Sequence, residues 1–193
     1  MYVRRLLLSV AVAAALVGAA CAEPPDKEIQ QAQGAIDAAR AAGADVYATG
    51  EFTAAQDALK RANDAVAQRD YRLALNHALD ARERAQNAAK EAADRKTTAR
   101  SEAERALLDA MTALNDAHTK LRAAETARAP AKTLTAARRA VTDGEDTVQK
   151  ARAAFDRGDF PAAKETLAGI TERLKETAHD LETATPAVKS RRR

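Results

Sequence analysis

Residues 51–129 contain neither glycine nor proline, and this absence constrains the fold more than any other feature of the sequence. These two residue types are the ones that most often end or bend a helix. Within the stretch, apolar residues recur at alternating spacings of three and four, as on a helix face that packs against a partner helix. We therefore expect one long helix over residues 71–128, although Ser101 and Glu104 have the spacing of a capping box that would begin a new helix there.

The same helical spacing covers the chain from Ile29 onward, and no segment alternates in the manner of a strand. The five helical segments that it predicts begin near Ile29, Phe52, Tyr71, Leu134 and Phe160. Most inward positions hold alanine, which is the best helix former but removes little apolar surface from water. Exposed ion pairs four residues apart, such as Asp80 with Arg84, should add a little helix stability.

A duplication relates two parts of the chain with an offset of 89 residues, which places Asp70 on Asp159 and Tyr71 on Phe160. In each copy we expect the aspartate to cap the second helix of a hairpin and the aromatic residue to fill the bend. The sequence therefore predicts an all-α protein of antiparallel helical hairpins or an elongated helical bundle with coiled-coil-like seams. Two related hairpins would be joined by the long central helix.

The first residues are typical of a secretory signal peptide, since Arg4 and Arg5 precede an uncharged run that is too short to span a bilayer. The only cysteine, Cys21, follows small residues, as lipoprotein signal peptidase requires, and it has no disulfide partner. We expect Cys21 to be acylated, with palmitate as one of its chains, and to anchor the protein. Ordinary cleavage after Ala22 stays open, because the residues before that bond also have the small-x-small form.

Ala22 differs from the aspartate that keeps many lipoproteins in the inner membrane, so the expected location is the outer membrane, facing the periplasm. A soluble periplasmic protein is the alternative. No later run is apolar enough for a transmembrane helix. The expected organisation is a signal peptide at 1–20, a lipidated tether at 21–26, a first helical unit at 27–95, a second unit with the diverged repeat at 96–184, and a basic tail at 185–193.

Charge and motifs argue against several functions. The chain has 31 Lys and Arg against 28 Asp and Glu, but the excess lies at the two ends, so nucleic acid is not an expected partner. His77, His118 and His179 lie far apart, and none has a second ligand at metal spacing. There is no phosphate-binding loop and no nucleophile motif. We expect no enzyme activity, no cofactor and no metal.

Five aromatic residues fall at the predicted hairpin bends. They are Tyr47, Phe52, Tyr71, Phe155 and Phe160. Either they fill the bends as part of the core, or they anchor a partner protein, as exposed aromatic side chains do at interfaces.

Three short patterns resemble those of the Ala-rich bacterial lipoprotein family that contains the domain of unknown function 4398. They are Ala41-Ala42-Gly43-Ala44 with Tyr47, Phe52-x-x-Ala55-x-x-x-Leu59, and Asp70-Tyr71-x-x-Ala74. The resemblance covers residues 27–95 and implies an envelope protein, with other envelope proteins or peptidoglycan as candidate partners. Two functions follow as hypotheses: a scaffolding lipoprotein, or an adaptor that binds a partner protein in a groove between helical hairpins.

Overall fold

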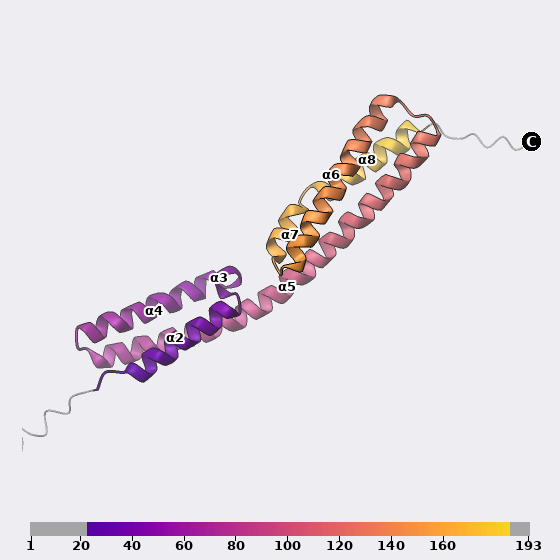
Figure 1. Ribbon diagram of the computed structural model, residues 1–193. Coiled ribbons are helices and arrows are strands. Elements are labelled where there is room, and N and C mark those ends of the chain that lie inside the picture. The colour runs from indigo at the N-terminus through magenta and orange to yellow at the C-terminus, as the bar shows by residue number, and fades with distance from the viewer. Residues whose placement is uncertain (1–22, 186–193) are drawn as a thin grey trace, which may run out of the picture. The chain divides into compact units, whose positions relative to one another are not determined.

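Figure 1 presents the computed structural model, which describes residues 23–185. Helices make up 88% of this part of the chain and no strand occurs in it, which confirms the all-α prediction. The expected signal peptide at 1–20, the acylation site Cys21 and the basic segment from residue 186 onward lie outside the described residues. None of the described helices combines the length and apolar character that crossing a membrane requires. The chain divides into two compact units between residues 93 and 94.

The first unit is a bundle of four helical segments. It contains α2 (Asp26–Ala41), α3 (Ala44–Tyr47), α4 (Thr49–Ala67) and the first part of α5 (Tyr71–Thr126). Alanine dominates its core: in the main buried cluster every residue is alanine except Ile36, Phe52 and Leu59. Because each alanine contact buries little surface, helix propensity and polar contacts between helices must contribute much of the stability.

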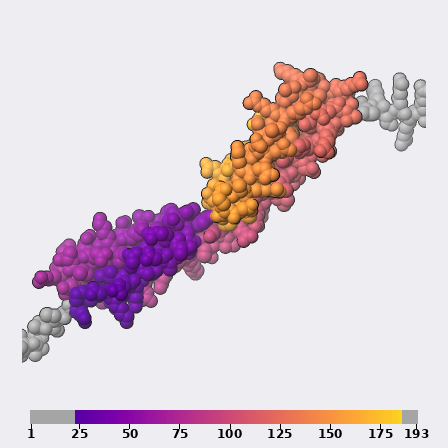
Figure 2. Space-filling view, in the orientation of Figure 1, coloured from indigo at the N-terminus to yellow at the C-terminus, as the bar shows by residue number. Residues whose placement is uncertain are grey.

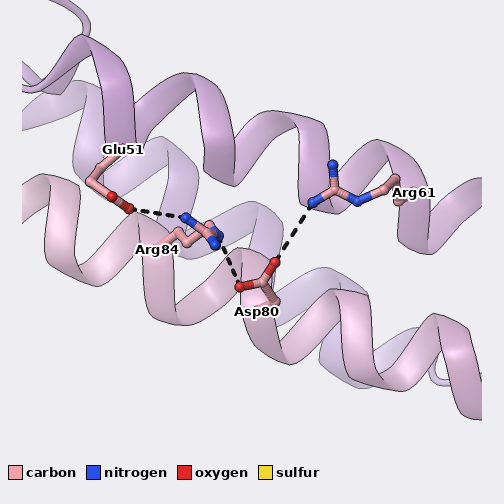
Figure 3. A network of polar contacts seen from close by, with 4 residues as sticks. All are labelled: Glu51, Arg61, Asp80 and Arg84. Carbon is pink, nitrogen blue, oxygen red and sulfur yellow. Dashed lines mark hydrogen bonds and ion pairs between the residues drawn. The ribbon is translucent and has the colours of Figure 1, made fainter.

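Four charged residues link α4 to α5 in this unit, as Figure 3 shows. The Arg84 guanidinium donates to Asp80 at 2.9 Å, the predicted pair within α5, and to Glu51 of α4 at 3.5 Å. Arg61 of α4 lies 3.7 Å from the Asp80 carboxylate. All four side chains are 38–50% exposed, so each pair stabilises the unit by only about 0.2–1 kcal/mol.

The second unit contains the rest of α5 with α6 (Ala131–Asp156), α7 (Phe160–Thr166) and α8 (Ile170–Ala184). Its core holds more large side chains than that of the first unit. They are Leu107, Leu121, Val141, Val148, Leu167, Ile170, Leu174 and Leu181. At Gly144 of α6, an added Cβ would lie 3.0 Å from a methyl group of Leu174 and 3.3 Å from one of Leu114. The missing side chain therefore lets α6 approach α5 and α8 closely.

The long central helix is confirmed, because α5 runs from Tyr71 to Thr126 without interruption. Thr98, a weak helix former, donates its hydroxyl hydrogen to the Asp94 carbonyl at 3.2 Å, which satisfies that group inside the helix. Ser101 lies within α5, so the capping-box alternative is wrong.

Prediction of a single helix after Phe160 is also wrong. The chain leaves helical geometry at residues 167–169 and forms two helices, α7 and α8, in place of one. Gly169 adopts a left-handed conformation with φ of 79°, which glycine reaches without a Cβ clash. Backbone hydrogen bonds across the break shorten to three-residue spacing, as in the bond from Leu167 N–H to the Lys164 carbonyl.

The two turns that the 89-residue offset aligns have the same hydrogen-bond pattern. In each, a left-handed residue donates its N–H to the carbonyl three residues earlier, and the following N–H bonds five residues back. The left-handed residue is Arg69 (φ 61°) in the first turn and Gly158 (φ 81°) in the second. The Asp70 and Asp159 carboxylates then accept the N–H three residues on, at 3.0 and 3.2 Å, so both predicted caps are confirmed.

Candidate partner-binding groove

An open groove of the second unit lies beside the break between α7 and α8. It has a volume of about 730 Å³ and is open to solvent. One face of α5 supplies one wall, and the other comes from α7, the break and the first turns of α8. Figure 2 shows the orange segment that contains α7 at the surface of this unit. Because the break opens this surface, the groove depends on residues 167–169.

The groove floor is apolar. Phe160 and Leu167 are 8% and 4% exposed and line it from below, with Ala106 from α5 beside them. The Phe160 ring packs on Phe155 with 5.1 Å between the centroids and a tilt of 57°, which is a favourable aromatic geometry. This contact holds Phe160 in place at the floor.

Charged side chains form the rim. Lys164 of α7 donates to the Glu102 carboxylate of α5 at 2.7 Å, and this hydrogen bond lowers the pKa of Glu102. Within α8, Lys175 donates to Glu172 at 2.7 Å, which raises the pKa of Lys175.

Two further rim carboxylates, Asp109 of α5 and Glu165 of α7, form no ion pair within 4 Å among the described residues, although Asp109 helps to raise the pKa of Lys175 at longer range. The rim as a whole therefore carries four carboxylates against two ammonium groups. This leaves an acidic surplus over an apolar floor.

The backbone at the break adds hydrogen-bonding capacity. Helix α8 begins after Gly169 without a side chain that caps its first N–H groups. Gly169 and Thr171 both line the groove. Ile170 N–H already donates to the Leu167 carbonyl at 3.3 Å, so the N–H groups of Thr171 and Glu172 are the ones at this edge of the groove that can donate to a carbonyl oxygen of a ligand.

The five aromatic residues predicted as partner contacts are divided between the two units. Tyr47, Phe52 and Tyr71 belong to the first unit, and Phe155 and Phe160 to the second. Tyr47 and Phe52 pack in or against the alanine-rich core, and the Arg40 guanidinium lies 5.4 Å above the Phe52 ring. Only Phe160 lines the groove at the helix break.

Tyr71 lies in a different groove, of about 620 Å³, together with Pro24 and Pro25. The chain that leads into α2 thus runs beside the bend between α4 and α5. Tyr71 is half-buried there rather than a free aromatic anchor.

Sequence reasoning missed the groove's charged residues. Glu102 and Asp109 lie seven residues apart on one face of α5, in a pattern that a solvated helix face also shows. The one available signal was Gly169, which stands where the first copy has Asp80.

The histidines do not meet in the structure. His118 Nε2 lies 2.9 Å from a Glu145 carboxylate oxygen, an exposed contact between α5 and α6. Within residues 23–185, no group of three or more His, Cys, Asp or Glu side chains is arranged to hold a metal ion. No polar or charged side chain in this part of the chain is buried. The groove combines an apolar floor with an acidic rim.

These features define an all-helical protein of two alanine-rich units, one of which carries an open groove. Residues 27–106 match the family model of a domain of unknown function, DUF4398, which confirms the resemblance to that domain. No curated protein and no solved structure matches the chain. The family match covers the first unit and reaches α5, but it ends before Asp109 and before α7 and α8. Most of the groove therefore lies outside the matched domain.

Proposed function

We propose that the protein is a cell-envelope lipoprotein with a scaffolding role, whose helical units stand in the periplasm on a lipid anchor in the outer membrane. The observation that carries this proposal is the surface of the described residues: every charged side chain is solvated, and ion pairs link neighbouring helices. Such a surface suits a structural element, which must stay helical with a thin core and must not aggregate.

The anchor is supported by the short distance between Cys21 and the first helix. Helix α2 begins at Asp26, so four residues separate Cys21 from this helix, and Cys21 and Asp26 can be at most about 18 Å apart. An acyl group on Cys21 would therefore hold the first unit close to the membrane surface.

Acylation is tested by growing bacteria with radiolabelled palmitate and comparing the wild type with a Cys21→Ser variant. An Ala22→Ser variant serves as the matched control, because it changes the neighbouring residue and keeps the thiol. We expect label on the wild type and the control, both in the outer membrane fraction, and none on Cys21→Ser. A mature chain that begins at Glu23 would contradict the anchor.

A second candidate function, an adaptor for a partner protein, is favoured by the groove beside α7 and α8. Affinity purification of the tagged chain from detergent-solubilised envelopes tests it. A partner should be lost with Asp109→Asn/Glu165→Gln and kept with Asp146→Asn/Glu176→Gln, which removes two exposed carboxylates outside the groove. Recovery of no envelope protein with the wild type would contradict the adaptor function.

A further inference from the structure

The groove exists because the second hairpin departs from its copy. The 89-residue offset aligns Gly169 with Asp80, a residue at which α5 continues as a regular helix. The Asp80 carboxylate bonds Arg84 and pairs with Arg61, whereas Gly169 has no side chain and turns into the left-handed region. Of the two aligned hairpins, the first thus has a continuous helix at this position, and the second has a helix break beside an open groove.

We propose that this groove binds a cationic segment of a partner protein. An aliphatic side chain of the segment would lie on the exposed apolar lining at Pro161 and Ala168, beside the buried Phe160. Its Lys or Arg side chains would pair with Asp109 and Glu165. The inference rests on the adaptor function and specifies the chemistry of the partner.

The charge of the groove rim favours a positively charged occupant. Glu102 and Glu172 form ion pairs with lysines, whereas Asp109 acts on Lys175 only at longer range and Glu165 forms no ion pair within the described residues. An acidic surplus attracts ammonium and guanidinium groups and repels phosphates and carboxylates, so lipid headgroups and anionic wall polymers fit poorly. The carboxylates are also not grouped as metal ligands in this part of the chain.

The remaining features favour a peptide over a small cation. A peptide supplies carbonyl oxygens for the uncapped N–H groups at the start of α8, and side chains for the apolar floor. The volume of about 730 Å³ lies within the range of about 300–1,000 Å³ that is usual for binding sites. A single amine would leave the floor exposed.

Panning a phage library of random 12-residue peptides against the purified full chain tests the inference. We expect the enriched peptides to carry at least two Lys or Arg beside an aliphatic residue. Their affinity for Asp109→Asn/Glu165→Gln should fall about tenfold, and for the wild type it should fall as salt is raised. The control Asp146→Asn/Glu176→Gln should bind as the wild type does.

Enrichment of uncharged or acidic peptides, no enrichment, or equal binding to both double variants would overturn the inference. Binding that appears only after the chain is shortened to Thr185 would also overturn it, because the basic segment 189–193 would then be the occupant. Failure here is distinguishable from failure of the proposed function, since palmitate labelling and envelope purification do not depend on these peptides.

Discussion

Replacing Arg69 by glycine should stabilise the first unit. Arg69 has φ of 61°, where a Cβ atom costs about 1–2 kcal/mol. Glycine removes that cost but loses about 0.5–1 kcal/mol through its greater freedom in the unfolded chain. The exposed Arg69 side chain forms no ion pair or hydrogen bond among the described residues, so nothing else is lost. The free energy of unfolding should therefore rise by about 0.5–1 kcal/mol.

The aligned turn of the second unit provides the reverse experiment. Gly158 has φ of 81°, and no atom lies within 4 Å of a Cβ built on it, so Gly158→Ala changes only the backbone cost. The free energy of unfolding should fall by about 0.5–1 kcal/mol, because alanine adds the Cβ cost of the left-handed region, which exceeds the gain from removing the greater freedom of glycine in the unfolded chain. The pair thus compares one backbone position in two sequence contexts.

Urea unfolding followed by circular dichroism at 222 nm measures the free energies, and hydrogen exchange of peptides from each turn assigns the change to its unit. The control is Arg72→Gly, an exposed arginine in the first turn of α5 with ordinary helical geometry, which should lose up to about 1 kcal/mol. If Arg69→Gly destabilises the protein as Arg72→Gly does, the cost assigned to the left-handed arginine is wrong.

Two further predictions concern the second unit. Gly144→Ala should lower the free energy of unfolding by about 1 kcal/mol, because crowding of the fully buried Leu174 outweighs the better helix propensity; a stabilised variant in urea unfolding would contradict this. Lys164→Gln should return the lowered pKa of Glu102 toward its ordinary value, as an NMR titration would show. Since a depressed carboxyl pKa stabilises the fold only above that pKa, wild type and variant should become equally stable as the pH falls through it; a stability difference that persists in acid would contradict the ion-pair argument.

Most of the fold could be predicted because its signals are local. Three-and-four spacing marks the buried faces, the absence of glycine and proline in 51–129 permits α5, and Asp70 and Asp159 cap the helices that follow them. Each signal acts within one or two helical turns. The prediction therefore did not depend on how the helices pack.

The groove could not be predicted in the same way, because its residues come from three helices and are ordinary exposed charges in sequence. Asp109 and Glu165 are 56 positions apart, and neither departs from the pattern of a solvated helix face. The few aromatic residues of the sequence were predicted as possible partner contacts, but of the five only Phe160 lines the groove. Rare residue types in this sequence therefore mark residues of the core and the bends, whereas the charged residues of the rim are common types.

Gly144 and Gly169 show why the helix break itself was missed. Both follow several residues of good helical pattern, yet Gly144 stays inside α6 and Gly169 ends the helical path between α7 and α8. A glycine costs a helix only about 1 kcal/mol, so packing decides the outcome. At Gly144 the close approach of Leu174 and Leu114 compensates for that cost. Gly169 instead adopts a left-handed φ of 79°, which its missing Cβ permits, and no atom lies within 4 Å of a Cβ built there. Backbone freedom at Gly169, and close packing at Gly144, therefore distinguish the two glycines.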